Sequence, residues 1–112
     1  MEINGTNIRL IRGDSDSITV QLSEGNEAKP LVTGDIVYFT VKKSAFETAK
    51  VFQKTITEFV DGKAIIPITH DDTKDMEFRS YVYDIQITFA DGTVKTIVPP
   101  SQFVIMPEVT YE

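Results

Sequence analysis

The chain has 112 residues, of which 41% are hydrophobic and 25% are charged, a composition typical of one globular domain rather than of a disordered segment. Its formal net charge of −6 opposes binding to nucleic acid or to an anionic membrane, because both require a basic surface. The absence of cysteine excludes disulfides, thiolate metal sites and cysteine nucleophiles. We therefore expect a single domain over residues 1–112 that needs no cofactor.

The N-terminal third contains two segments with the alternating pattern of strands. Residues 3–11 form a first strand region that Gly5 interrupts, and residues 17–22 alternate between apolar and polar side chains. Residues 23–34 are mostly polar and contain Pro30, so the sequence predicts a loop there. The N-terminus lacks the pattern of a signal peptide, and no apolar run has the length of a membrane span, so we expect the chain to fold in the cytosol.

The segment 35–43 is rich in β-branched and aromatic residues and is predicted to be a strand. Val37, Phe39 and Val41 share one face, which we expect to be buried. Tyr38 lies on the opposite face, where it would belong to an exposed aromatic patch.

Residues 44–50 are compatible with one helical turn, in which Ser44 is the N-cap and Glu47 completes a capping box. The segment is too short to form a helix that is stable on its own. A strand is predicted at 51–57, with an apolar face directed inward.

Asp61-Gly62 predicts another hairpin turn, and a compact apolar strand follows at 63–68. Pro67 indicates an edge or an end of that strand, because proline donates no ladder hydrogen bond. Residues 69–78 are predicted to contain one helical turn, capped by Thr69 or Asp71, in a crossover between two sheets.

The segment 79–98 is the clearest hairpin, with two strand-like runs on either side of Asp91-Gly92. Its first run places the following large side chains on one face: Tyr81, Tyr83, Ile85, Ile87 and Phe89. The other face carries Asp84, Gln86 and Thr88. We expect the apolar face to be core and the polar face to be outer sheet surface.

Pro99-Pro100 is expected to break the chain before a last strand at 102–109. The pattern predicts an all-β fold, an antiparallel β-sandwich of about seven to eight strands with one or two short helical turns. A single sheet closed on itself is the alternative, and the long 23–34 loop fits the sandwich better.

The single histidine, His70, lies beside Asp71 and Asp72, with Asp75 nearby. A metal site on a helix would require a second ligand with the appropriate spacing, and no second histidine exists. We therefore interpret the acidic residues as helix caps in a solvated turn. No serine lies in a nucleophile motif, and we predict that the protein is not an enzyme.

Arg12-Gly13-Asp14 spells a tripeptide that cell-surface receptors recognise when it is displayed on an exposed turn. A three-residue match is weak support for such a site. Glycine and aspartate are also common in turns for conformational reasons, and we favour that interpretation.

The candidate interaction surface consists of four residues on the outer faces of two predicted strands: Tyr38, Asp84, Gln86 and Thr88. Tyr38 supplies an aromatic group for contact with a sugar or with a protein. We favour a packing or subunit contact, because aromatic residues are enriched in protein interfaces.

Several blocks, in this order, resemble a phage protein family: GDIVYFTVKKS at 34–44, KVFQKTI at 50–56, DDTKDME at 71–77, YVYDIQITFADGTVKTIV at 81–98 and FVIMPEVT at 103–110. A looser similarity covers IRGDSDSITVQL at 11–22. The chain is similar to the N-terminal domain of baseplate upper proteins, from phages and prophages of Gram-positive hosts. Proteins of that family continue into further parts, and this chain would correspond to the sandwich domain alone.

The resemblance implies an immunoglobulin-like sandwich that acts as a virion structural protein in the tail or baseplate. It would be made in the host bacterial cytoplasm and then assembled into the virion, with other tail or baseplate proteins, or copies of itself, as partners. The family offers no catalytic residues to transfer. A carbohydrate-binding module that contacts the host cell surface is the alternative function.

Overall fold

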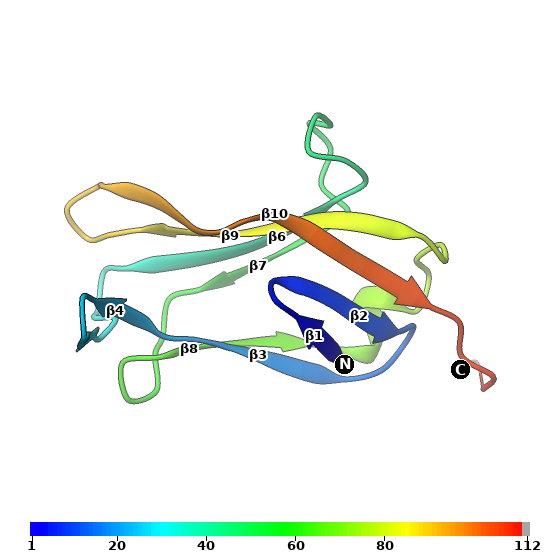
Figure 1. The fold of residues 1–112 in the computed structure, drawn as a ribbon, viewed down its shortest axis with the longest axis horizontal. Helices are drawn as coiled ribbons and strands as arrows, with labels where there is room; N and C mark the ends of the chain where they lie inside the picture. The colour runs from blue at the N-terminus through cyan, green and yellow to red at the C-terminus, as the bar shows by residue number, and fades with distance from the viewer. Residues whose placement is uncertain (111–112) are drawn as a thin grey trace.

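The computed structural model describes residues 1–110 and shows two layers of strands (Figure 1). The larger layer is a six-stranded sheet with the spatial order β1-β2-β10-β9-β6-β7. Its strands are β1 (Glu2–Asn4), β2 (Asn7–Ile11), β6 (Ile36–Lys42), β7 (Phe52–Ile56), β9 (Ser80–Thr88) and β10 (Val94–Met106). The sheet is open, since β1 and β7 form its two edges.

The second layer is much smaller and contains the pair β3 (Asp16–Val20) and β8 (Ala64–Ile68). A separate hairpin of β4 (Leu22–Glu24) and β5 (Glu27–Lys29) lies at one end of the molecule (Figure 1). A single helical turn, α1 (His70–Thr73), connects β8 of the small layer to β9 of the large layer, as expected for a crossover between sheets.

The prediction of an all-β sandwich is confirmed. The order β2-β10-β9-β6-β7, facing β3-β8, corresponds to the extended GFC sheet of a variable-type immunoglobulin sandwich facing strands B and E. Strands β2 and β10 run parallel, so the prediction of a wholly antiparallel arrangement is wrong at this pair. The chain passes from β2 into the other layer and returns to β10 only much later, so no hairpin forces the two strands to run in opposite directions.

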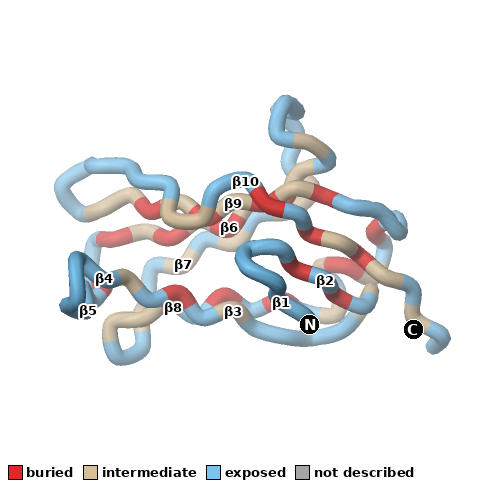
Figure 2. The backbone as a smooth tube through the Cα atoms, in the orientation of Figure 1, coloured by how far each residue is buried: buried red, intermediate tan, exposed pale blue. Residues whose placement is uncertain are grey.

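The core lies between the layers, where alternate residues of each strand are buried (Figure 2). Tyr81, Tyr83, Ile85 and Ile87 are buried as predicted, and Phe89 is half-buried against the same core. The predicted inward face of β6 is also confirmed, because its three large apolar residues Val37, Phe39 and Val41 are fully buried.

An aromatic cluster forms the centre of this core. The ring of Phe39 lies 5.2 Å from the ring of Tyr83 and 6.0 Å from those of Phe52 and Phe103, measured between centroids. These distances fall in the range at which aromatic pairs attract each other. The four rings belong to β6, β9, β7 and β10, so the cluster joins four strands of the large sheet.

Tyr81, the second residue of β9, fixes the crossover that leads into the strand. Its hydroxyl accepts a hydrogen bond from the backbone N–H of Glu77 (2.9 Å) and donates one to the Glu77 carbonyl (3.2 Å). A tyrosine near the start of strand F that bonds the backbone a few residues upstream is the tyrosine corner of immunoglobulin-like sandwiches. This contact and the strand order are two features that the fold shares with such sandwiches.

Three local predictions are wrong. Residues 23–34 are not a plain loop, because β4 and β5 pair as a hairpin around Gly25, whose φ is 60°. Residues 44–50 form no helix; a single hydrogen bond from the N–H of Glu47 to the carbonyl of Ser44 (3.3 Å) closes a turn. The segment has no buried apolar face to stabilise a helix.

The third error concerns Pro99-Pro100, which does not interrupt β10. The pairing with β9 shifts register between Val98 and Ser101, so the prolines lie in a bulge where no ladder donor is required. The β4–β5 hairpin, and the division of the predicted first strand region into β1 and β2, raise the count to ten strands in residues 1–110, against the seven or eight expected. One helical turn is present, preceded by Thr69 as predicted.

The turn at Asp61-Gly62 is confirmed, with φ angles of 51° and 75° and a bridge between Val60 and Lys63. The strands that it connects, β7 and β8, belong to different sheets, so it is not the turn of a paired hairpin. Pro67 lies on β8, whose only pairing partner is β3, in agreement with the predicted edge position.

Replacing Tyr81 with phenylalanine should destabilise the fold by about 1 kcal/mol, because it removes two hydrogen bonds and retains the ring. Urea denaturation followed by circular dichroism measures this change. Tyr38→Phe is the matched control on the outer face, and its midpoint should equal that of the wild type. Equal midpoints for Tyr81→Phe and the wild type would contradict the assignment of the tyrosine corner.

Candidate functional site

The outer face of the large sheet brings together the four residues singled out from the sequence. Strands β6 and β9 are neighbours, and their register places Tyr38 opposite Gln86 and Ile36 opposite Thr88. Thr40 lies opposite Asp84 in the next row. All of these side chains are half-buried by their neighbours in the sheet. We call this set, Ile36, Tyr38, Thr40, Asp84, Gln86 and Thr88, the outer face.

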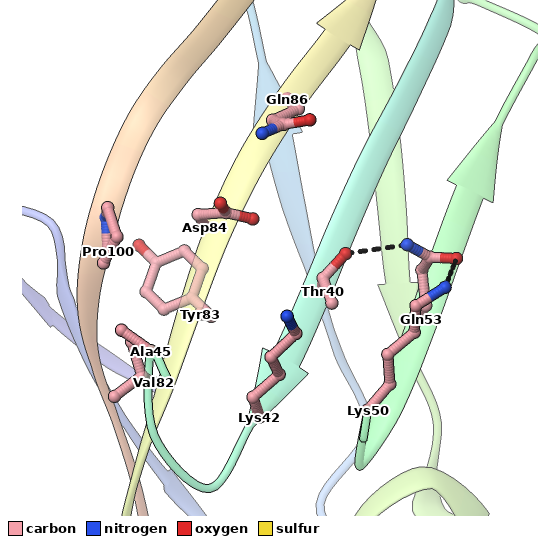
Figure 3. A pocket seen from close by; sticks show the side chains of 10 residues that line it. All are labelled: Thr40, Lys42, Ala45, Lys50, Gln53, Val82, Tyr83, Asp84, Gln86 and Pro100. Carbon is pink, nitrogen blue, oxygen red and sulfur yellow. Dashed lines mark hydrogen bonds between the residues drawn. The ribbon is translucent and has the colours of Figure 1, made fainter. Parts of the chain in front are cut away.

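A shallow groove of about 240 Å³ crosses one end of the outer face (Figure 3). It is lined by Thr40, Lys42, Ala45, Lys50, Gln53, Val82, Tyr83, Asp84, Gln86 and Pro100. These residues come from β6, β7, β9, the bulge in β10 and the loop between β6 and β7. The groove therefore combines polar groups with two basic side chains along one rim.

A short chain of hydrogen bonds orders the β7 side of the groove. The side-chain amide of Gln53 donates to Thr40 Oγ1 (2.8 Å), and Lys50 Nζ donates to Gln53 Oε1 (3.1 Å). Figure 3 shows these three side chains in a row beside Asp84. The row presents donors and acceptors in fixed positions, which is a requirement for selective binding of a polar group.

Asp84 is the acidic group of the groove. Burial raises its pKa above the usual range for an aspartate, and the positive charge of Lys42 opposes that rise only in part. Within residues 1–110 no hydrogen bond to its carboxylate forms. A half-buried carboxylate without a hydrogen-bond donor is available to a donor or a cation from a bound partner.

His70 and the neighbouring acids are engaged in the fold. His70 Nδ1 lies 2.7 Å from the carbonyl of Gly13, while Asp72 accepts from the N–H of Thr69 (2.7 Å) and pairs with Lys54 (2.8 Å). Burial acts to raise the pKa of Asp72, but the hydrogen bonds from Lys54 and Thr69 outweigh it and lower the pKa. In residues 1–110 no three metal-binding side chains cluster together. The hydrogen bond from the N–H of Thr69 to Asp72 supports the capping interpretation.

The tripeptide at 12–14 is not displayed as a recognition loop would be. Arg12 forms a bidentate pair with Glu108, at 2.9 Å and 2.7 Å, and its guanidinium lies 4.0 Å from the ring centre of Phe78. A third hydrogen bond joins it to the carbonyl of Met76 (3.2 Å). The arginine therefore connects the start of the chain to the end of β10, which is a structural role.

Sequence reasoning missed most of the groove. Lys42, Gln53 and Pro100 were not identified, because their proximity depends on the register of three strands and on the bulge in β10. The alternation in β6 and β9 identified the face, but it contains no information on which residues of the two strands lie opposite each other.

A scan against protein-family models finds no match for the chain, and a search of the curated proteins finds none either. In the described part of the chain, no helix has the length and apolar character needed to cross a membrane. The site must therefore be interpreted from its own geometry.

Asp84→Asn should stabilise the protein at about pH 7 and leave its stability unchanged at about pH 3. Burial raises the pKa of Asp84 in the folded state. The protonated Asp84 therefore contributes fully to the free energy of unfolding when the pH is below its pKa in the unfolded state. This contribution is lost as the pH rises through its pKa in the folded state, where the half-buried carboxyl group must ionise. Chemical denaturation at both pH values measures the difference.

Glu108→Gln is a control for which we expect the opposite dependence of stability on pH. The hydrogen bond from Arg12 lowers the pKa of Glu108, so its contribution is present above the unfolded pKa and lost as the pH falls through the folded pKa. This variant should be destabilised near neutral pH and not in acid. A destabilised Asp84→Asn protein at neutral pH would show that the carboxylate has a partner within the fold.

Proposed function

We propose that this protein is a non-enzymatic structural module of a phage or prophage tail or baseplate, which binds a partner protein across the outer face of its large sheet. The observation that carries the proposal is the outer face itself. One side of the six-stranded sheet is covered by β3 and β8, while the other side exposes a flat array with a central tyrosine.

The composition of the outer face favours a protein partner. Tyr38 lies opposite Gln86 on one neighbouring strand and opposite Thr55 on the other, and its side chain is half-buried. A tyrosine at such a position offers apolar area and a polar tip, a property of residues that anchor interfaces. Asp84 and Lys42 supply charges of both signs on the same side of the sheet, which would select the orientation of the partner.

The phage setting rests on the sequence blocks. The blocks 34–44 and 81–98 form β6, β9 and the first part of β10, and together they supply most of the outer face. The part of the chain with the strongest resemblance to baseplate upper proteins is thus the part that would bind. We infer assembly in the host cytoplasm, followed by incorporation into the tail or baseplate beside other proteins of that structure.

Mass spectrometry of purified particles from the source phage or induced prophage tests whether this protein is part of the phage particle. The account predicts this polypeptide at a fixed ratio to a known tail protein. Its consistent absence from intact particles would overturn the proposal.

A variant tests the surface. Gln86→Lys places a longer, charged side chain at the centre of the outer face and should lower incorporation into particles by about tenfold, because this side chain displaces the partner and must be desolvated there. Thr19→Lys, on the exposed face of β3, is the matched control and should be incorporated normally. Equal incorporation of both variants would exclude the outer face as the docking surface.

Carbohydrate binding is the second candidate, and the groove is the observation that favours it. Asp84, Gln86 and Gln53 can bond sugar hydroxyls, and Tyr38 lies in the same sheet face as a stacking surface. Pull-down with cell walls of the host measures this activity, and Tyr38→Ala should reduce binding by about tenfold if stacking contributes. Absence of binding, or binding that Tyr38→Ala leaves unchanged, would dispose of this candidate.

A further inference from the structure

The loop between β6 and β7, residues 43–51, projects from the large sheet away from the rest of the molecule (Figure 1). It carries Phe46, whose side chain is 97% exposed. An aromatic residue exposed at the tip of a projecting loop gains the full free energy of burial when it enters an apolar pocket of a partner.

The sequence around Phe46 is basic, in contrast to the whole chain. Residues 42–50 contain Lys42, Lys43 and Lys50 against the single acid Glu47, whereas the chain has a net charge of −6. The base of the loop is held by Arg79, which donates to the carbonyl of Lys43 (3.3 Å). The loop 43–51 therefore combines an exposed aromatic side chain with a net positive charge.

A complementary surface lies on the opposite side of the molecule. A wide hollow of about 810 Å³ is lined by Leu31, Val32, Thr33, Thr57, Glu58, Phe59 and Gly62, and we call it the Val32 hollow. A hydrogen bond from the N–H of Leu31 to the carbonyl of Gly62 (2.9 Å) joins its two walls. Val32 is 55% exposed, and Phe59 is half-buried beside it.

The Val32 hollow carries negative charge, opposite in sign to the net charge of the loop. Glu58 is the only charged residue among those that line it, and the exposed Asp61 precedes Gly62 at its rim. A ring placed in this hollow would bring the lysines of its own loop towards these carboxylates. Phe46 would meet the exposed Val32 and the half-buried Phe59 there, and the net positive charge of the loop would lie near Glu58.

We propose that Phe46 of one copy binds in the Val32 hollow of a second copy. This inference rests on the proposed function as an assembly module and names one of its partners. The loop and the hollow are formed by different segments of the chain, so the contact is head-to-tail, and repeated contacts close a ring or extend a filament. An anionic membrane fits less well, because a flat bilayer fills no hollow and the net charge opposes its approach.

Cysteine crosslinking tests the contact, because the natural chain contains no cysteine. The variant Phe46→Cys/Val32→Cys should form a ladder of disulfide-linked multimers under mild oxidation. The control Phe46→Cys/Ile3→Cys pairs the same loop with a residue of matched exposure, 56%, on the edge strand β1. The first variant should crosslink at least about tenfold faster, since contact raises the effective concentration of the two thiols.

Charge reversal provides a second measurement that leaves Phe46 in place. Lys43→Glu should weaken self-association in a light-scattering dilution series, and Lys43→Glu combined with Glu58→Lys should restore it. Equal crosslinking rates for the two cysteine variants, or a wild-type protein that stays monomeric up to millimolar concentration, would overturn the inference. Either result leaves the proposed function standing if particles still contain the protein and Gln86→Lys still prevents its incorporation.

Discussion

The packing of Phe39 against Tyr83 and Phe103 is the constraint on which the rest of the structure depends. These rings belong to the three adjacent strands β6, β9 and β10, and all three are buried. Side chains alternate between the two faces of a strand, so when one set of alternate residues is buried, the other set must lie on the outer face. A slip of one residue in any of these strands would bring polar groups into the core and expose the rings. The core thereby places Tyr38, Asp84 and Gln86 outside.

The unequal layers explain why the outer face is available. Two strands, β3 and β8, cover one side of the large sheet. Tyr81 fixes the entry into β9 through the backbone of Glu77, and Arg12 joins the start of the chain to Glu108. Arg12, part of a tripeptide that the sequence offered as a recognition motif, is thus used inside the fold. The polar face of β9, which the sequence offered as an interaction surface, stays on the outer side of the sheet.

The sequence predicted the elements whose pattern arises from burial on one side. Strands β6 and β9 alternate clearly, and their buried and outer faces were assigned correctly. The hairpin of β4 and β5 escaped prediction because five of its six strand residues are exposed, so no apolar period marks it. The prediction that Pro99-Pro100 ends the strand was wrong. Proline cannot donate a ladder hydrogen bond, and the bulge at this position requires none. The register of the strands and the parallel pairing of β2 with β10 depend on tertiary contacts. The shape of the groove depends on that register, so it could not be predicted from one sequence.

The most direct test of the account is the accessibility of the outer face before and after assembly. A single thiol introduced as Gln86→Cys, in a chain with no other cysteine, can be labelled with a maleimide in the free protein and in purified particles. The account predicts rapid labelling of the free protein and strong protection in the particle, while Thr19→Cys on β3 stays accessible in both. Equal labelling of the Gln86→Cys thiol in the two states would contradict the claim that this face binds a partner.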